Sequence, residues 1–278
     1  MDIAVTGGNG RLGKVLIDLL LQHGHAVRSL DWTKSAQPYP SGLPVQPIQI
    51  DLNDLKALTR AVEGCWAVIH LAAILNPEDV DTGVLYKNNT IASFNVLQAA
   101  ATLGIDKVCL ASSINALGGA RSRRGRYDYF PVDEKHPTYN EDDYALSKWV
   151  LEQQADSFAR RKPQMTISSL RFHALPSEPP ELSHTLDTSE NGVARTLWGW
   201  TLINEAARAC EKAILAGYHG HEVFYITAQN TSSAIPSLEL ARFAYPKVPI
   251  RGDLSGNRSF FNCEKAARLL GWRHGTYH

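Results

Sequence analysis

Tyr144 and Lys148 are the residues of this chain whose types and spacing most directly suggest chemistry. They lie four positions apart in a segment, Asp142 to Arg161, that we expect to be a helix, so both side chains project from one face. A lysine ammonium beside a phenol favours the phenolate and lowers its pKa from about 10. The pair could therefore exchange a proton with a substrate hydroxyl or carbonyl. The spacing alone also fits a surface tyrosine and a solvated lysine.

A serine could act together with this pair. The apolar run at 107–111 is predicted to be a strand and ends in Ser112 and Ser113, and the tyrosine helix follows it in the chain. The hydroxyl of Ser113 could hydrogen-bond the same substrate oxygen that the tyrosine protonates or deprotonates.

A glycine-rich stretch, Thr6 to Gly13, lies between an apolar run at 3–5 and an expected helix at 14–22. Gly7, Gly10 and Gly13 fit the pattern T-G-x-x-G-x-x-G, and strand, glycine turn and helix is the context that gives such a pattern meaning. Glycine lets the backbone turn sharply and approach a pyrophosphate, and free N–H groups at the helix N-terminus favour its negative charge. The stretch predicts a dinucleotide site, with an ordinary structural turn as the alternative.

Two aspartates follow the next predicted strands. Asp31 ends the strand at 26–30, where a carboxylate would accept hydrogen bonds from an adenosine ribose and repel a 2′-phosphate. NAD is therefore favoured over NADP, although Arg28 and Lys34 leave NADP open. Asp51 ends the strand at 45–50 and could accept from the adenine amino group or cap the next helix.

Strands and helices alternate along the chain, which predicts a parallel sheet with helices on both faces. The predicted strands are 3–5, 26–30, 45–50, 67–71, 107–111, 165–170 and 222–227. The predicted helices between them are 14–22, 53–62, 81–103, 142–161 and 198–216. Ligands bind such sheets at the carboxyl ends of the strands, where we find Gly7, Asp31, Asp51, Ala72, Ser113 and Arg171. His70 lies within an apolar run, and we interpret it as a packed core histidine.

The alternation breaks after Arg171. Prolines make 173–191 an unusually long loop, and short helices near 237–244 and 262–270 follow the last strand. We expect an α/β fold of the Rossmann-type, doubly wound class with a small C-terminal substrate lobe. Residues 1–172, with 198–227 returning to them, would form the dinucleotide-binding domain, and residues 173–197 and 228–278 the substrate lobe.

The composition restricts the classes of partner. The chain has 278 residues, 44% of them apolar, and 28 basic residues balance 28 acidic ones. Zero net charge argues against nucleic acid or an anionic membrane as the main partner, and no apolar run approaches membrane-spanning length. The four cysteines are widely separated and form no cluster with metal-ligand spacing, so we expect free thiols, no metal site and a cytoplasmic location.

Together these motifs resemble the extended short-chain dehydrogenase/reductase family, in its NAD-dependent epimerase/dehydratase branch. The resemblance covers nearly the whole chain in the family's order. It rests on Thr6 to Gly13, Asp31, Asp51-Leu52, His70-Leu71-Ala72-Ala73, Asn89, Ala111-Ser112-Ser113, Tyr144 to Lys148, and Leu269-Leu270-Gly271-Trp272.

The resemblance implies roles for individual residues. Tyr144 is the catalytic acid/base, Lys148 binds the nicotinamide ribose and tunes the tyrosine, and Ser113 polarises the substrate oxygen. Asn89 supports the lysine through backbone and water contacts. The expected cofactor-binding residues are Gly7, Gly10, Arg11, Leu12, Gly13, Asp31, Asp51, Leu52, Leu71, Ala72, Ala73, Asn89, Ser112, Tyr144, Lys148 and Arg171.

The chain departs from the family's pattern on the substrate side. Phe172 to Pro176 replaces the usual Pro and Tyr-Gly-Pro run after the sixth strand, and Ile114 to Gly119 replaces the usual Val-Tyr-Gly. Asn115 could bind substrate or close a turn, and His173 could face the substrate. The basic run at Arg121, Arg123, Arg124 and Arg126 would be a solvated surface or would capture an anionic substrate.

These observations favour an NAD(P)-dependent oxidoreductase that interconverts an alcohol and a carbonyl on a sugar, sugar acid or similar small polar substrate. An epimerase or dehydratase with tightly bound NAD is the alternative, and a non-catalytic cofactor-binding regulator is a third class. The resemblance also implies a homodimer paired through the helices at 81–103 and 142–161.

Overall fold

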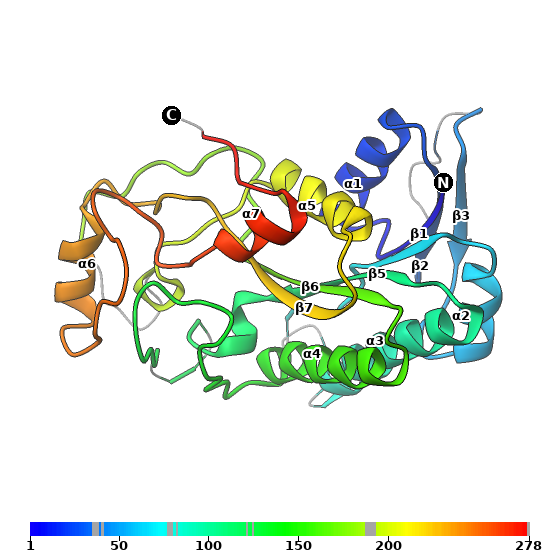
Figure 1. Cartoon of the computed structure of the whole chain (residues 1–278), viewed down its shortest axis with the longest axis horizontal. Helices are drawn as coiled ribbons and strands as arrows, with labels where there is room; N and C mark the ends of the chain where they lie inside the picture. Colours follow the sequence, from blue (N-terminus) through cyan, green and yellow to red (C-terminus); the bar gives the residue numbers. More distant parts are fainter. Residues whose placement is uncertain are drawn as a thin grey trace.

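Seven strands form one parallel sheet in the part of the chain that the structure describes. The computed structural model describes residues 1–34, 39, 42–76, 80–81, 83–120, 122–123, 125–186 and 193–276. The strand order is β3-β2-β1-β4-β5-β6-β7 (Figure 1). The strands are β1 (Asp2–Thr6), β2 (Ala26–Asp31), β3 (Val45–Gln49), β4 (Ala67–His70), β5 (Lys107–Ser113), β6 (Thr166–Phe172) and β7 (Gly220–Ile226). The predicted doubly wound α/β fold is confirmed.

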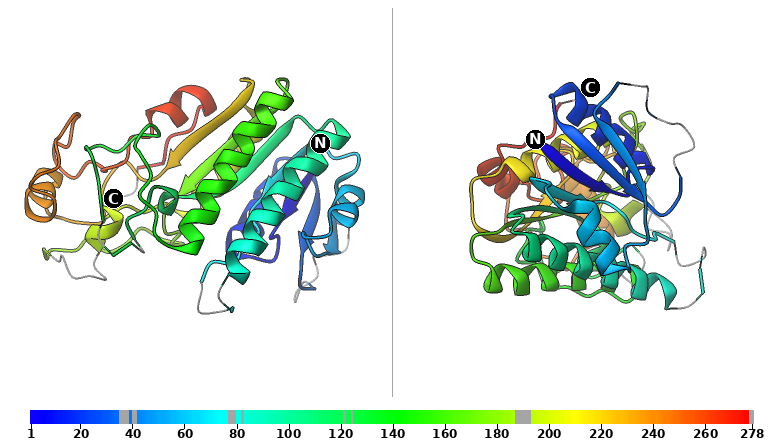
Figure 2. Two further views of the ribbon diagram at one scale, coloured as in Figure 1. Left: turned by 90° about the horizontal axis from the view of Figure 1, so that it is seen from below. Right: turned by 90° about the vertical axis from the view of Figure 1, so that its right-hand side faces the viewer.

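Helices cover both faces of the sheet, as Figures 1 and 2 show. On one face, α1 (Arg11–Gln22), α5 (Ile203–Leu215) and α7 (Glu264–Leu270) pack in one apolar cluster with the sheet. On the other face, α2 (Leu55–Val62), α3 (Val84–Leu103) and α4 (Asp143–Arg161) share a second cluster. The long helices α3 and α4 lie side by side below the sheet in Figure 1.

Local sequence explains why α4 forms where it does. The Asp142 side chain caps the helix by accepting from the Ala145 amide at 2.9 Å. Asp143 in the first turn and two arginines in the last turn complement the helix dipole. Apolar positions at helical spacing, including Leu151, Ala155 and Phe158, pack under the sheet. The helix is therefore anchored along its length, with its N-terminal end at the carboxyl edge of the sheet.

The element boundaries differ from prediction in a few places. The strand predicted at 107–111 continues through Ser113, and the register pairs Ser113 with Phe172 of β6. The helix predicted from 198 begins at Ile203: Trp198 takes a positive φ of 51° that a helix excludes, and the backbone is still extended at Leu202. None of the helices in the described ranges is both long and apolar enough to cross a membrane.

The helix α6 (Ser237–Ala244) lies beyond the carboxyl edge of the sheet (Figure 1). A separate apolar cluster forms around it. It joins segments that are far apart in the chain: η2 (Ile114–Leu117), η3 (Val193–Thr196) and residues 127–132 pack with the C-terminal segment. Isolated bridges pair Phe130 with Ile250 and Val132 with Phe261. The segment before α4 therefore packs against the C-terminal one at this end of the molecule.

Candidate active site

A cleft of about 1270 Å³ runs along the carboxyl ends of the strands. Most of the residues that the sequence singles out line it, although they come from distant parts of the chain. They are Gly7, Gly10, Arg11, Leu12, Gly13, Asp31, Asp51, Leu52, Leu71, Ala72, Ala73, Ser112, Ser113, Tyr144, Lys148 and His173. Three predicted residues are not among the described lining residues: Asn89, Asn115 and Arg171.

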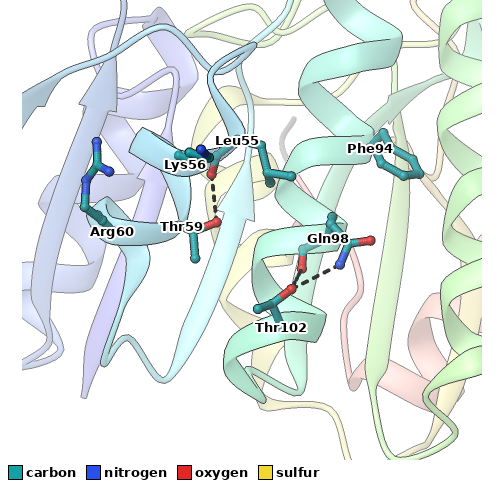
Figure 3. A pocket seen from close by; sticks show the side chains of 7 residues that line it. All are labelled: Leu55, Lys56, Thr59, Arg60, Phe94, Gln98 and Thr102. Atoms are coloured by element: carbon teal, nitrogen blue, oxygen red, sulfur yellow. Dashed lines mark hydrogen bonds between the residues drawn. The ribbon is translucent and has the colours of Figure 1, made fainter.

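A shallower hollow of about 550 Å³ lies between α2 and α3 (Figure 3). Its lining combines Leu55 and Phe94 with polar and basic side chains, and none of the predicted site residues is among them. Thr59 and Thr102 donate hydrogen bonds to carbonyls of their own helices, at 2.7 and 2.8 Å. The cleft at the strand ends is therefore the candidate active site.

The glycine loop has almost no room for side chains. Gly7 has a φ of +72°, and a Cβ there would lie 2.8 Å from the Ala72 amide nitrogen. A Cβ on Gly13 would lie 2.2 Å from the Gly7 carbonyl oxygen. Gly10 caps α1 without a side chain, so the first amides of that helix face the cleft unobstructed by a capping group. This geometry fits a pyrophosphate against the backbone.

Asp31 lies beside this loop at the end of β2. Its carboxylate accepts from the Asn9 amide at 3.0 Å and from the Thr33 amide at 3.1 Å, which fixes its orientation at the cleft. Arg28 points elsewhere, because its guanidinium donates to the carbonyls of Ala61 and Glu63. Asp31 therefore contributes a negative charge to this end of the cleft, and of the two basic residues that left NADP open, Arg28 is directed away from it.

Asp51 and Leu52 line the same end of the cleft. The Asp51 carboxylate accepts from the amide and the side chain of Asn53, both at 2.9 Å. The predicted alternative that Asp51 caps the next helix is wrong, because α2 begins at Leu55 and Asp54 caps it. Asp51 is thus held at the cleft by a tight local turn.

Lys148 is buried, with 3% of its surface exposed. Its ammonium donates to the Ala111 carbonyl at 2.7 Å and lies 5.6 Å from the centre of the Tyr144 ring. Burial lowers the pKa of Lys148 to about 8, and the nearby Glu152 carboxylate opposes that shift. The alternative of a solvated lysine is therefore wrong, and the tyrosine and lysine both face the cleft.

The two serines at the end of β5 take different roles. The Ser113 hydroxyl accepts from the Asn115 amide at 3.1 Å, at the start of η2, and lines the cleft. The Ser112 hydroxyl donates to the Glu152 carboxylate at 2.6 Å, so it faces the interior behind the lysine.

Asn89 acts behind the cleft wall. Its amide exchanges two hydrogen bonds with the backbone of Ile74, at 2.8 and 2.9 Å, and its nitrogen lies 3.4 Å from the Ser147 hydroxyl. It thereby fixes the segment after β4 and contacts the helix that carries Lys148. Its predicted supporting role is consistent with this position. His70 is buried and bonded to Thr6 at 2.8 Å, which confirms the core-histidine interpretation.

Arg171 is directed away from the cleft. Its guanidinium makes two bonds to Glu152, at 2.8 and 2.9 Å, and one to the Tyr225 hydroxyl at 3.0 Å. The predicted contact between Arg171 and the cofactor therefore has no geometric support. The sequence analysis missed Glu152, which the spacing Lys148-x-x-x-Glu152 on one helix face could have revealed.

Two predicted substrate residues are engaged in local structure. The Asn115 backbone closes the turn of η2, since its carbonyl accepts from Gly118 at 2.8 Å, while its buried side-chain oxygen has no hydrogen-bond partner among the described residues. The His173 ring bonds to the Thr196 carbonyl at 3.0 Å and the Ala174 amide at 2.7 Å, and burial lowers its pKa to about 4. His173 thus lines the cleft as a neutral ring with both nitrogens in use.

The basic run is a surface feature where the structure describes it. Arg123 contacts Glu141 at 3.5 Å, and Arg126 stacks over the Tyr139 ring at 3.7 Å. Both side chains are largely exposed. Arg121 and Arg124 lie outside the described residues. The described part of the run therefore fits the solvated surface better than anion capture.

A family model described as the NAD dependent epimerase/dehydratase family matches residues 3–234. The chain belongs to this family. The match confirms the predicted resemblance. The glycine loop, Asp31 and the tyrosine–lysine pair all lie within the matched residues.

Curated relatives agree with this placement. The chain is 26% identical over 229 residues to a uronate dehydrogenase from Pseudomonas syringae pv. tomato, covering 82% of this chain and 74% of the relative. It is 30% identical over 166 residues to a sterol-4-alpha-carboxylate 3-dehydrogenase (decarboxylating) from Dictyostelium discoideum, covering 58% of this chain and 50% of the relative. Several such matches span about half the length of the relative.

Solved structures share the fold. A uronate dehydrogenase from Agrobacterium tumefaciens, solved with NAD, superposes with a TM-score of 0.71 at 20% identity, covering 99% of this chain and 84% of that one. A UDP-glucose 4-epimerase from Thermotoga maritima, solved with UDP-glucose, gives a TM-score of 0.70 at 21% identity, covering 100% and 94%.

Proposed function

We propose that this protein is an NAD-dependent oxidoreductase that interconverts an alcohol and a carbonyl on a sugar, a sugar acid or a similar small polar molecule. The observation that carries the proposal is that Ser113, Tyr144 and Lys148 line the same cleft as the glycine loop and Asp31. A proton-transfer group and a cofactor cradle in one cleft are what hydride transfer between a nicotinamide and a substrate requires.

The cleft fits the proposed cofactor at several points. The glycine loop and the first amides of α1 would hold the pyrophosphate, Asp31 the adenosine ribose, and Asp51 the adenine. The carboxylate of Asp31, fixed by Asn9 and Thr33, favours a ribose with a free 2′-hydroxyl. NAD, when bound, supplies the hydride acceptor or donor.

The protein itself would move the proton. Tyr144 would take the proton from a substrate hydroxyl or return one to a carbonyl oxygen. The Lys148 ammonium, 5.6 Å from the centre of the tyrosine ring, favours the phenolate by charge. Ser113, on the adjoining strand end, would donate a hydrogen bond to the same substrate oxygen. These groups line one cleft at the carboxyl edge of the sheet, where a substrate bound beside the cofactor could be positioned for the reaction.

The proposed substrate class is inferred from the relatives. The uronate dehydrogenase relative matches most of this chain, and uronates are sugar acids. We propose that residues 173–197 and 228–278 contribute the substrate lobe. The homodimer and the cytoplasmic location stay predictions.

An epimerase with tightly bound NAD is the second candidate, because solved UDP-glucose 4-epimerases share the fold over the whole chain. Such an enzyme retains its cofactor through purification and forms no net NADH with substrate. The oxidoreductase exchanges cofactor with solution and forms NADH in proportion to the substrate oxidised.

The experiment is a substrate panel with Tyr144→Phe. Wild-type protein should form NADH with at least one sugar, uronate or simple alcohol, and the variant should bind NAD normally while its kcat falls by about 100-fold or more. Tyr86→Phe on α3, outside the described cleft lining, is the matched control and should keep wild-type turnover. Wild-type turnover in Tyr144→Phe would refute the proposal.

A further inference from the structure

A buried carboxylate lies one helical turn beyond Lys148 on α4. Glu152 is 2% exposed, and each of its oxygens is bonded. One oxygen accepts from the Ser112 hydroxyl at 2.6 Å and from Arg171 Nε at 2.9 Å, and the other accepts from Arg171 Nη2 at 2.8 Å. Such a bidentate, charge-assisted pair fixes the position of the carboxylate.

This carboxylate joins the helix to the ends of two strands. Ser112 precedes Ser113 on β5, and Arg171 lies opposite Ser112 on β6. The same arginine reaches the Tyr225 hydroxyl on β7 at 3.0 Å. Through Glu152, the segment of α4 that carries Lys148 is therefore tied to the strand edge that presents Ser113.

Among the described residues, Glu152 is the negatively charged group that acts on Lys148. His70 from β4 is neutral, because burial and the lysine charge lower its pKa to about 3. Burial raises the pKa of Tyr225 on β7 to about 12, so this phenol is neutral as well. Arg171 from β6 is positive and is bound to Glu152.

We propose that Glu152 is a positioning residue that, fixed by Arg171 and Ser112, keeps Lys148 in its ammonium form beside Tyr144. This inference rests on the proposed role of Lys148 in the reaction. Burial alone opposes a charged lysine, and an uncharged amine would lose its electrostatic hold on the phenolate. Glu152 is thus needed for proton transfer although it does not touch the cleft.

The test is a pH titration of Lys148 in the cofactor-free protein. NMR of lysine labelled at Cε monitors the titration, and the Lys148→Arg variant identifies the Lys148 signal. The wild-type midpoint should lie near 8. In Glu152→Gln, which keeps the size of the side chain and removes its charge, the midpoint should fall by about one pH unit. A midpoint that stays or rises would overturn the proposal.

Two further variants make the result specific. Asp156→Asn is the matched control, because Asp156 also joins α4 to the sheet, through His221 at 2.7 Å, one turn further on. Its Lys148 midpoint should equal the wild-type value, and an equal fall in both variants would contradict a role specific to Glu152. If the unpaired Arg171 prevents Glu152→Gln from folding, the double variant Glu152→Gln/Arg171→Gln removes both charges. Its midpoint should still lie below the wild-type value, by less than in Glu152→Gln, because the loss of the arginine charge offsets part of the loss of the carboxylate.

Activity gives a second readout. In Glu152→Gln the alkaline loss of kcat should move to lower pH by about the same amount as the titration midpoint, while KM for NAD changes little. The two proposals fail separately. Wild-type turnover in Tyr144→Phe would refute the proposed function and leave the titration result standing. An unchanged midpoint, with Tyr144→Phe inactive, would refute only the role of Glu152.

Discussion

The two halves of α4 are each joined to the sheet by a network of polar side chains, and the two networks differ in where they end. In the N-terminal half, Glu152 meets Ser112 and Arg171 directly behind the lysine of the cleft. In the C-terminal half, Asp156 accepts from His221 at 2.7 Å, and the other ring nitrogen of His221 lies 2.8 Å from the Ser169 hydroxyl.

The second network has the residue types and the connectivity of a serine nucleophile with its base and orienting acid. Yet Ser169 is 0% exposed in the middle of β6, and it is not among the described residues of the cleft. A substrate cannot reach its hydroxyl. Both networks contain residue types suited to catalysis, but only the first lies next to a cleft large enough for a cofactor. Access to that cleft therefore distinguishes the candidate site from a purely structural network.

The largest loss of turnover should come from Lys148→Met, beside the first network. Methionine fits the buried position without a charge, so the fold should persist while the phenolate loses its support. We expect kcat to fall by about 100-fold or more, and NAD to bind more weakly, because the lysine is also predicted to contact the nicotinamide ribose. Steady-state kinetics and calorimetric titration with NAD measure the two effects, and a loss of less than about threefold would remove the lysine from the mechanism.

A smaller effect, on stability alone, is expected from Asp156→Asn. The hydrogen bond from His221 lowers the pKa of Asp156 below its usual 3.8. The tie therefore stabilises the fold above that value and loses its contribution as the pH falls through the lower folded-state pKa.

Since Asp156 is partly exposed, we expect the variant to be less stable by under about 1 kcal/mol at neutral pH. The difference should shrink below about pH 4. Urea denaturation of both proteins at neutral pH and below about pH 4 measures this difference in the free energy of unfolding. A difference that grows in acid would contradict the assigned sign.

The smallest effect on turnover should come from Ser169→Ala. Because this hydroxyl is sealed inside the sheet, kcat and KM should stay within about twofold of wild type, although stability falls by about 1 kcal/mol from the lost hydrogen bond. Parallel kinetics and denaturation separate the two. A large loss of turnover would mean that the second network is not merely structural.

The sequence was most informative where function depends on short-range spacing. The glycine loop and the tyrosine–lysine pair are each contained in a few residues of one turn or one helix. Alternation of strand and helix then placed Asp31 and Ser113 at the same sheet edge. All of these line the cleft, as expected.

The sequence was least informative where a partner comes from another strand. Arg171 stands at a strand end like Ser113, but its guanidinium pairs with Glu152, and only packing of α4 on β6 reveals this. The tie between His221 and Asp156 joins residues 65 positions apart. The two ring nitrogens of His173 are bonded to the Thr196 carbonyl and the Ala174 amide, which composition does not reveal.

A crystal structure of the protein with NAD tests the central claim most directly. The account predicts the pyrophosphate on the amides of the glycine loop and the nicotinamide ring at the end of the cleft lined by Ser113 and Tyr144. A ring bound away from the Tyr144 hydroxyl, with the cofactor otherwise ordered, would contradict it.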